Sequence, residues 1–492
     1  MIAQSLTLPN RICNFQELYI KTLGEVQSNG EGINIGKGSM LSTDTYMNLF
    51  DAGTWLHYTE IRKWKLRICL SGKGSIRLIC WQNDEQYLLE KIHIDTAALY
   101  SLTIPFFHFQ EEGMYYFEIE AETQIYLKNA YYMPQKAEVK RNIQLGLIIC
   151  TYHRQKALYQ NLQVLRESRF FDKADGLFGK LKIYVIDNAS ELPLNKEPFI
   201  TIHYNPNTGG SGGFTRGIEE IRKNVNSCGF TNVIFMDDDV EVLSETFFRL
   251  YALLAFIKEE YQQEVIAGRM FRMDQRQVQY TAAEIWNAGD IQHIGWNLDM
   301  TEQENLIRLN DNTGAQYGGW WFASFPMSFV LKNTPLPFFI HCDDVEYGIR
   351  HGGNQIILNG IQVWHETYEY RQSPVIMYYD TRNSLIVNSI YSMNQDTLAI
   401  LIEWKKNISQ QHVNDDYFSE YMLIQAMWDF IKGPKWFFKI KSSKLKVWKS
   451  YKRNSFFLRV NNALFWRLTD KRARAKLDNI LKSYQQLCVT IQ

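Results

Sequence analysis

The stretch "NVIFMDDD" (Asn232–Asp239) is an apolar run that ends in three consecutive aspartates. Two similar runs precede it, "QLGLIIC" (Gln144–Cys150) and "LKIYVIDN" (Leu181–Asn188), and the helix-like stretch "KALYQNLQVLRES" (Lys156–Ser168) lies between those two. Strands that are buried on both faces are apolar throughout, and their alternation with helices is typical of an α/β domain with a mostly parallel sheet. These three runs therefore decide the fold class of the middle of the chain.

Polar residues follow each of these runs, namely Cys150–Arg154, Asp187–Asn188 and Asp237–Asp239. Ligands of open α/β sheets bind at the carboxyl edge of the strands. Three strand ends with polar residues in the same relative place predict a binding site at that edge.

The regions on either side differ in pattern. Residues 1–138 contain short Ile-, Leu-, Tyr- and Phe-rich segments such as "WKLRICLSG", "SIRLICWQ", "YSLTIPFFHF" and "MYYFEIEA", separated by apparent turns such as "SGKGS" and "QND". This pattern indicates an all-β sandwich or barrel. We assign residues 139–392 to the α/β domain and residues 393–492 to a helical C-terminal region.

Composition excludes several classes of function. The 492-residue chain has a formal net charge of zero at pH 7, so no global charge points to nucleic acid. Its seven cysteines show no metal-type spacing, which favours free thiols in a reducing compartment. The N-terminal sequence lacks a signal pattern, and no apolar run approaches the ~20 residues that span a bilayer. We therefore expect a cytosolic protein or one at the cytosolic face of a membrane.

The C-terminal region is basic between Lys432 and Lys482, where Asp470 and Asp478 are the only acids. Aromatic residues interleave with the basic ones; they include Trp436, Phe437, Phe438, Trp448, Phe456, Phe457 and Trp466. A solvated helical face is the default explanation, and a surface that lies on anionic lipid headgroups is the main alternative. Nucleic-acid binding is a weaker third alternative, because no recognised module accompanies the charge.

The triple aspartate is a candidate metal site. An Asp-x-Asp at the end of a buried strand offers the oxygen ligands that Mg²⁺ and Mn²⁺ prefer. An acidic run that caps the helical stretch from Ser244 is the alternative. His365 in "VWHETY" follows another apolar stretch, although a lone histidine is more often structural than a ligand.

Two further motifs are candidates for contact with a bound substrate. "NPNTGGSGGFTRG" (Asn205–Gly217) is a glycine cluster that leads into an amphipathic helix, whose N-terminus favours anions; a surface loop is the alternative. "YGGWWFASFP" contains Trp320 and Trp321. If both lie in a strand, one is buried and the other is exposed to stack on a sugar ring. Two core tryptophans are the alternative.

The stretch "FFIHCDDVEYGIR" (Phe338–Arg350) places Asp343 and Asp344 at the start of a predicted helix. A carboxylate there can act as a general base toward a hydroxyl group, while N-terminal capping of the helix is the simpler explanation.

Taken in order, "TYHR", "VIDN", the glycine cluster, "FMDDD", "GGWW", "PLPFFIxxDDxEYGxR", "WH" and "YYxxRNSL" resemble the motifs of inverting GT-A glycosyltransferases of the galactofuranosyltransferase type. The resemblance includes "TYMNLFDAGTWLHYT" (Thr45–Thr59), which is similar to the N-terminal β-sandwich of those enzymes. It implies transfer of galactofuranose from UDP-galactofuranose to a lipid-linked glycan at the inner face of the membrane. This chain has Asp380 where those relatives carry histidine.

The resemblance also implies residue roles. Asp237, Asp239 and His365 would hold Mn²⁺ or Mg²⁺, and Asp344, with Asp343 beside it, would be the general base. The nucleotide sugar would contact Arg154, Asp187, Asn207, Gly209, Gly210, Asp237 and Asp238. The sugars would contact Trp320, Trp321, Arg382 and Asn383.

Alternatives remain open from the residues alone. The donor could be dTDP-rhamnose or UDP-galactopyranose, because the motifs describe a diphosphate and a metal rather than a ring size. A glycan-binding protein without catalysis is an alternative of another class, and a metal-dependent phosphohydrolase would need a second acidic cluster beside the first. The acceptor, the linkage and the oligomeric state are not determined, and homo-oligomerisation is compatible with the sequence.

Overall fold

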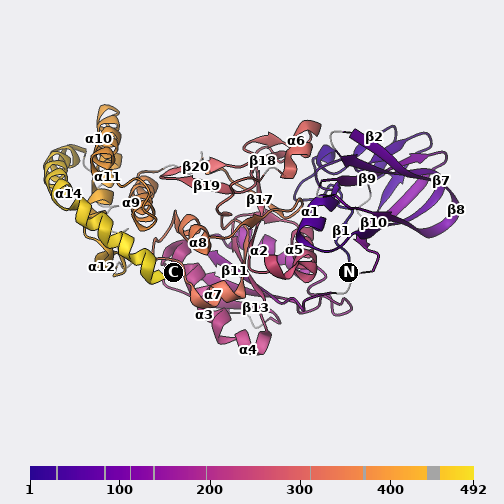
Figure 1. The fold of residues 1–492 in the computed structure, drawn as a ribbon, viewed down its shortest axis with the longest axis horizontal. Helices are drawn as coiled ribbons and strands as arrows, with labels where there is room; N and C mark the ends of the chain where they lie inside the picture. The colour runs from indigo at the N-terminus through magenta and orange to yellow at the C-terminus, as the bar shows by residue number, and fades with distance from the viewer. Residues whose placement is uncertain are drawn as a thin grey trace.

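The computed structural model describes residues 1–491 except 29–31, 83–84, 111, 137–138, 195–196, 311, 369–372 and 440–454. The molecule is elongated, with β-strands of the N-terminal part at one end, helices of the C-terminal part at the other and the α/β region between them (Figure 1). The proposed boundary at residue 138 lies outside the described residues, and the division into three domains stays a proposal.

The N-terminal part is all-β, as predicted. Its strands form one barrel-like sheet: β1 (Gln4–Ser5), β2 (Lys21–Leu23), β3 (Val26–Ser28), β4 (Ile33–Ile35), β5 (Met40–Ser42), β6 (Phe50–Asp51), β7 (Lys63–Gln82), β8 (Glu85–Phe107), β9 (Met114–Ala121) and β10 (Ile125–Pro134). The expectation of a two-sheet sandwich is thereby modified. The first half of β7 pairs with β10 and its second half pairs with β9. This one strand therefore connects the two parts of the sheet that a sandwich would separate.

The predicted turn "SGKGS" is wrong. Ser71–Ser75 lies inside β7, where the ladder with β8 changes register between Leu70 and Gly72. Gly72 adopts φ +120°, a backbone conformation that L side chains rarely adopt, so the sequence signal for a turn marks an irregularity within a long strand. Of the predicted turn "QND", Gln82 ends β7, while residues 83–84 lie outside the described residues.

A buried arginine connects the N-terminal sheet to the α/β region. Helix α1 (Ala52–Tyr58) follows β6, and the segment before it contacts helix α5 (Ser244–Phe256). Arg249 of α5 is 1% exposed and donates to the carbonyl oxygens of Met47 and Asn359 at 2.7 and 3.0 Å. Burial lowers the pKa of Arg249, while Glu245 beside it raises this pKa. The two parts therefore share a buried polar interface.

The middle of the chain contains the predicted mostly parallel sheet, which confirms the α/β assignment. Seven strands lie in the order β13 (Ile200–Tyr204), β12 (Leu181–Asp187), β11 (Leu145–Thr151), β14 (Asn232–Asp237), β22 (Ala323–Pro326), β16 (Val265–Ala267) and β23 (Gln355–Ile356). The first four are parallel to one another, and β22 runs antiparallel to β14.

Helices cover both faces of this sheet. Leucines of α2 (Gln155–Arg166) pack with Leu147 and Ile149 of β11, whereas Phe214, Ile218 and Ile221 of α3 (Gly209–Lys223) pack with Ile148. Successive β11 side chains therefore enter opposite cores, which is why this strand is apolar at consecutive positions. The shorter helices of this region are α4 (Val225–Cys228), α6 (Gln303–Ile307), α7 (Met327–Lys332) and α8 (Asp343–His351).

A second sheet and a hairpin stand beside the carboxyl edge of the main sheet. The sheet has the order β15 (Glu241–Val242), β24 (Gln362–His365), β17 (Arg269–Arg272), β18 (Val278–Thr281) and β21 (Leu298–Asp299). The hairpin consists of β19 (Glu284–Asn287) and β20 (Asp290–His293).

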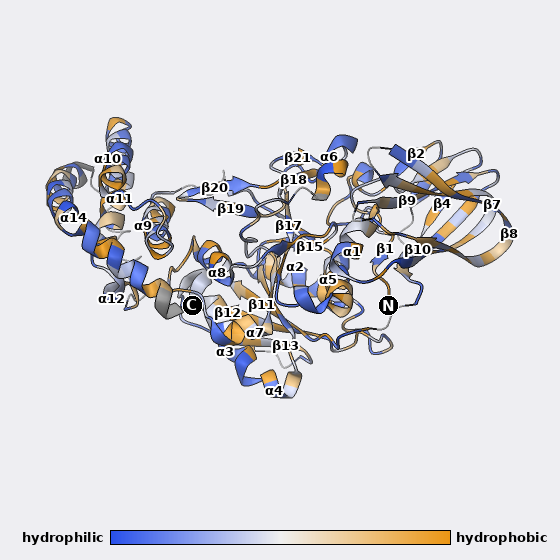
Figure 2. Ribbon diagram, in the orientation of Figure 1, coloured by the Kyte–Doolittle hydropathy of each residue, from blue (hydrophilic) through white to orange (hydrophobic). Residues whose placement is uncertain are grey.

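The C-terminal part is helical, as predicted. It contains α9 (Pro374–Ile390), α10 (Thr397–Val413), α11 (Tyr417–Phe430), α12 (Pro434–Phe437) and α14 (Ser455–Ile491), which share one apolar core. Helices α10 and α14 carry hydrophilic and hydrophobic residues along their length (Figure 2). Among the described residues, no helix combines the length and apolarity needed to cross a bilayer. Trp448 lies outside the described residues, as do the side chains of Phe456 and Phe457.

Candidate active site

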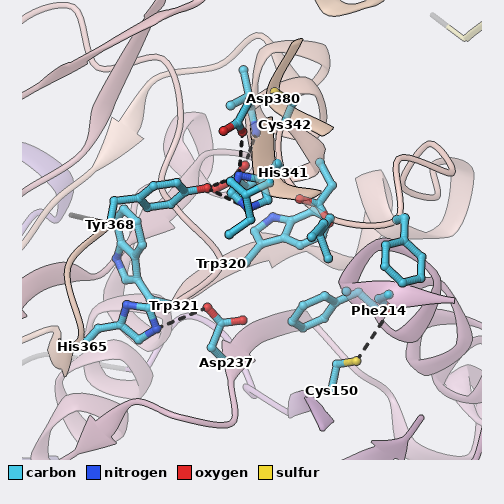
Figure 3. Close-up of a pocket in the computed structure, with 18 of the residues that line it drawn as sticks. Cys150, Phe214, Asp237, Trp320, Trp321, His341, Cys342, His365, Tyr368 and Asp380 are labelled. Atoms are coloured by element: carbon cyan, nitrogen blue, oxygen red, sulfur yellow. Dashed lines mark hydrogen bonds and ion pairs between the residues drawn. The ribbon is translucent and has the colours of Figure 1, made fainter. Parts of the chain in front are cut away.

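A cavity of about 930 Å³ lies at the carboxyl edge of the main sheet. Its walls come from the ends of β11 and β14, the start of α3, the β19–β20 hairpin, the start of α8 and the segment after β24. The predicted site residues that line it are Arg154, Asn207, Gly209, Gly210, Asp237, Asp238, Trp320, Trp321, Asp343, Asp344 and His365. Most of the predicted site thus surrounds one space, part of which Figure 3 shows.

Two carboxylates and an imidazole meet on one side of the cavity. Asp237 ends β14, Asp239 follows it, and His365 ends β24 of the second sheet. Nε2 of His365 lies 3.1 Å from Oδ1 of Asp239 and 3.9 Å from Oδ2 of Asp237 (Figure 3 draws the latter). One ligand atom from each of the three lies within 4.8 Å of the others. This donor set, two oxygens and one nitrogen, suits Mn²⁺ or Mg²⁺.

The middle aspartate, Asp238, is held by protein groups. Its carboxylate accepts from Thr151 Oγ1 at 2.6 Å and from Arg154 Nη1 at 3.3 Å, and the side chain is buried. Burial raises the pKa of Asp238, and the negative charge of Asp239 raises it further. Arg154 Nη1 also lies 2.7 Å from Asp239 Oδ2, so a guanidinium offsets part of the acidic charge. Thr151 and Arg154 therefore offset part of the repulsion among the three consecutive aspartates.

Asp343 and Asp344, at the first turn of α8, also line the cavity. Ser211 donates its hydroxyl hydrogen to Asp343 Oδ2 at 2.8 Å, which ties the glycine-rich start of α3 to this pair. Burial raises the pKa of Asp344 well above the ordinary range of a carboxyl, and Asp343 and Glu284 raise it further. Burial also raises the pKa of Asp343, against the hydrogen bond from Ser211. When ionised, a carboxylate whose pKa is raised is a stronger base and can accept a proton from a substrate hydroxyl.

The glycine cluster forms the first turns of α3, not a loop before it, and packs closely against the segment that leads to Asp343. Gly209 has φ +73°, and a Cβ there would lie 2.0 Å from the carbonyl oxygen of Phe339. A Cβ on Gly213 would lie 2.1 Å from Cys150 Sγ. These two glycines are required by backbone conformation or close packing, while Gly209 and Gly210 also line the cavity.

The backbone before α8 is strained. Phe339, His341 and Cys342 have φ values of 80°, 65° and 62°, in the left-handed region that few non-glycine residues adopt. Two residues of α9 donate hydrogen bonds to the backbone carbonyl oxygens of this segment. Arg382 Nη2 donates to the carbonyl oxygen of Phe338 at 2.7 Å, and Asn383 Nδ2 donates to those of Ile340 and His341, both at 2.8 Å.

Comparisons with known proteins find similarity to galactofuranosyltransferases. The model of the galactofuranosyltransferase 2 N-terminal family matches residues 10–135. Galactofuranosyltransferase GlfT2 of Mycobacterium tuberculosis is 25% identical over 459 residues, covering 85% of this chain and 70% of that protein. GlfT2 of Mycolicibacterium smegmatis is 24% identical over 449 residues, covering 84% of this chain and 67% of that protein. The chain is galactofuranosyltransferase-like.

The similarity to a solved structure is weaker, both in sequence identity and in TM-score. The CBM22-1 xylan-binding domain of Paenibacillus barcinonensis Xyn10C is 9% identical, with a TM-score of 0.21, and the match covers 28% of this chain and 97% of that domain. A likeness of this size supports no argument about this galactofuranosyltransferase-like chain.

The tryptophan pair departs from the prediction that one of the two is exposed. Trp320 and Trp321 lie in a turn rather than a strand and are 5% and 9% exposed. Trp320 packs on Phe214 with ring centroids 4.9 Å apart, and Trp321 Nε1 donates to the carbonyl oxygen of Gly268 at 2.8 Å. Both still line the cavity, because a turn does not send neighbouring side chains to opposite faces.

Four predicted site residues are not among those that line the cavity: Asp239, which belongs to the acidic cluster described above, and three predicted contact residues. The carboxylate of Asp187 accepts from the backbone N–H groups of Ala189, Glu191 and Leu192 at 2.7–2.9 Å and so shapes the loop after β12. Arg382 and Asn383 are 2% and 0% exposed and support the segment before α8 as described above. The geometry gives these residues a positioning role, and their contacts with substrate stay predictions.

Other lining residues had no signal strong enough for a sequence prediction. Glu284 of β19 is 4% exposed and faces the cavity near Asp344. Asp380 Oδ1 lies 2.8 Å from His341 Nδ1, and Tyr368 OH contacts the same imidazole (Figure 3). Asp380 stood out only as a departure from the relatives, while isolated residues such as Glu284 and Tyr368 belong to no local motif.

Proposed function

We propose that this chain is a metal-dependent, inverting galactofuranosyltransferase of the GT-A fold, which moves galactofuranose from UDP-galactofuranose to a hydroxyl group of a glycan. One observation carries the proposal. Asp237 and His365 of the Asp237–Asp239–His365 cluster line the same cavity as the Asp343–Asp344 pair, although the cluster and the pair come from separate parts of the chain. The similarity to GlfT2 over most of the chain supports the choice of donor sugar.

The cluster would hold Mn²⁺ or Mg²⁺ through Asp237, Asp239 and His365. A bound divalent cation supplies positive charge that stabilises the leaving diphosphate. Arg154, beside Asp239, and the N-terminus of α3, at Gly209 and Gly210, add donors that favour the same anion.

Asp344 then acts as the general base. It accepts the proton of the acceptor hydroxyl while that oxygen attacks the anomeric carbon from the face opposite the diphosphate. The bond from the sugar to the diphosphate breaks as the new glycosidic bond forms, so a single displacement inverts the configuration. Asp343, fixed by Ser211, orients the acceptor beside Asp344.

The acceptor is proposed to be a lipid-linked glycan at the cytosolic face of the inner membrane, with the C-terminal helices as the membrane contact. Helix α14 exposes Val460, Leu464 and Leu468 at 56%, 60% and 51%, spaced four residues apart on one stripe. Arg467, Lys471 and Arg474 lie on the same helix. Exposed apolar residues beside basic ones favour binding at the surface of an anionic bilayer.

A screen of donors tests the proposed activity. The purified protein is incubated with Mn²⁺, a galactan-type acceptor and UDP-galactofuranose, UDP-galactopyranose or dTDP-rhamnose. Release of UDP or dTDP is measured, and the product is examined by mass spectrometry. We expect turnover with UDP-galactofuranose that a chelator abolishes. Turnover only with another donor would correct the sugar, and metal-independent glycan binding without turnover would assign the chain to the non-catalytic class.

A further inference from the structure

Strand β8 is a long, exposed edge of the N-terminal sheet, at the end of the molecule farthest from the C-terminal helices (Figure 1). Within the described part of the chain it pairs only with β7. Large apolar side chains are exposed along it: Tyr87 (45%), Leu88 (58%), Leu89 (46%), Leu99 (49%) and Tyr100 (55%). A strand edge of this kind is a template for pairing with another strand.

Irregularities limit the part of β8 that can pair regularly. The ladder with β7 shifts at Leu89, where Glu90 pairs with Leu78 and Leu88 with Ile79. It shifts again at residues 97–99, where Thr96 pairs with Gly72 and Tyr100 with Leu70. Between these bulges, Glu90–Thr96 forms an uninterrupted ladder, and His93 is its central residue. Bulges end regular pairing, so a partner strand would match this short segment only.

The charges of this segment are self-complementary about its centre. If two β8 strands pair antiparallel with His93 opposite His93, Lys91 of each copy lies opposite Asp95 of the other. Within one copy, Lys91 lies opposite Arg77 of β7, whose guanidinium pairs with Glu118 at 2.7 Å, and Asp95 Oδ2 lies 3.8 Å from Lys73 Nζ. Pairing with a second copy would add the two Lys91–Asp95 contacts to these. Opposite charges directly across a ladder contribute ~0.2–1 kcal/mol each.

The two faces of the strand agree with this register. Side chains alternate along a strand, so Ile92 and Ile94 lie on one face of the sheet, where their cross-strand neighbours in β7 are Ile76 and Gly74. Lys91, His93 and Asp95 lie on the other face. Pairing about His93 places Ile92 opposite Ile94 of the second copy. A shift by one residue would put Lys91 opposite Ile94 and expose the apolar face instead.

We propose that this edge binds a second copy of the chain, through antiparallel pairing of the two β8 strands about a two-fold axis at His93. The paired strands join the two N-terminal sheets into one, and Tyr87, Leu88 and Leu89 of one copy lie near Leu99 of the other. The two sets of C-terminal helices then lie at opposite ends of the dimer, so both remain accessible.

Charge reversal tests the register. The full-length chain has a mass of 57.9 kDa, and sedimentation velocity over a range of protein concentrations distinguishes monomer from dimer. Lys91→Asp places like charges opposite one another, as does Asp95→Lys, and each is expected to weaken the dimer by roughly tenfold or more. The double variant Lys91→Asp/Asp95→Lys restores opposite charges and is expected to restore the dimer. Lys128→Asp, on β10 with neighbours on both sides, is the matched control and should leave the dimer unchanged.

A cross-link tests the symmetry axis. His93→Cys places a cysteine opposite its own copy, at a cross-strand separation that suits a disulfide. Mild oxidation should give a covalent dimer that a reductant reverses, and Lys128→Cys should not. A wild-type chain that stays monomeric, a dimer indifferent to both single charge reversals, or failure of the double variant to restore pairing would overturn the proposal.

Discussion

Nε2 of His365 lies 3.1 Å from Oδ1 of Asp239, although 126 residues separate the two in the chain. The contact exists because β24 and β14 belong to different sheets that meet at the cavity. It brings a third candidate ligand to the acidic strand end, and it makes the proposed metal site a property of the folded chain.

Asp239→Ala is expected to abolish the binding of Mn²⁺ that depends on this cluster, because it removes one of three ligands. Calorimetric titration of the purified protein with Mn²⁺ measures the loss directly. Glu304→Ala, an exposed acid on α6, is the control and should titrate like the wild type. An Asp239→Ala variant with wild-type affinity would show that the cation binds elsewhere.

Asp344→Asn is expected to lower kcat by roughly 10²–10⁴-fold, the usual size of general-base loss, and to leave donor affinity nearly unchanged. A second variant, at Asp343, tests the role of Asp344 through the pH dependence of the rate, because the charge of Asp343 raises the pKa of Asp344. Asp343→Asn removes that charge and lowers the pKa of Asp344. Asp344 then stays ionised at lower pH, so the acid limb of the kcat/KM profile should move to lower pH. An acid limb that does not move, or moves upward, would show that another group is the base.

Gly209→Ala is expected to destabilise the fold by roughly 1–3 kcal/mol, because a side chain is strained at φ +73° and its Cβ would meet the Phe339 carbonyl oxygen. Chemical denaturation measures the change. Gly176→Ala is the matched control, since no atom lies within 4 Å of the added Cβ and its φ is not positive. Equal stability of the two variants would mean that the close approach of α3 to the Phe339 segment is not needed.

Asn383→Asp keeps the shape of the side chain but removes the N–H groups that hold the carbonyl oxygens of Ile340 and His341. The strained segment before Asp343 should relax, and kcat should fall by up to ~10²-fold, as expected when reacting groups move by about 1 Å. Because this residue does not contact the acidic cluster, Mn²⁺ affinity should remain that of the wild type. Normal turnover in the folded variant would argue against this positioning role.

Leu464→Glu on α14 is expected to reduce binding to vesicles that contain phosphatidylglycerol, because it places a negative charge in the exposed apolar stripe. Vesicle co-sedimentation compares it with Leu23→Glu, a change at an equally exposed leucine (65%, against 60% for Leu464) of the N-terminal sheet. Vesicles of phosphatidylcholine alone should bind the wild type more weakly. If both variants bind like the wild type, the C-terminal helix is not the membrane contact.

Local pattern was sufficient where one segment determines its own state. The apolar runs that became β11, β12 and β14 were recognisable because each is buried on both faces, and the helix of Ser244–Phe256 follows its own periodicity. Pattern failed at "SGKGS", where glycines permit a bend inside β7 and the pairing of that strand with β8, β9 and β10 overrides the turn signal. It also failed for Trp320 and Trp321, since exposure depends on what other segments pack against a turn.

The sequence by itself determined the order of β, α/β and helical regions and the residue types of the site, because hydrophobic period and side-chain chemistry are local properties. Only the tertiary structure decided which of those residues share a cavity. It placed His365 beside Asp239 and Glu284 near Asp344. It also showed that Asp187, Arg382 and Asn383 hydrogen-bond to nearby backbone groups and so position the segments around the cavity. Such contacts join residues far apart in the chain, and their distances are fixed only when the sheets pack.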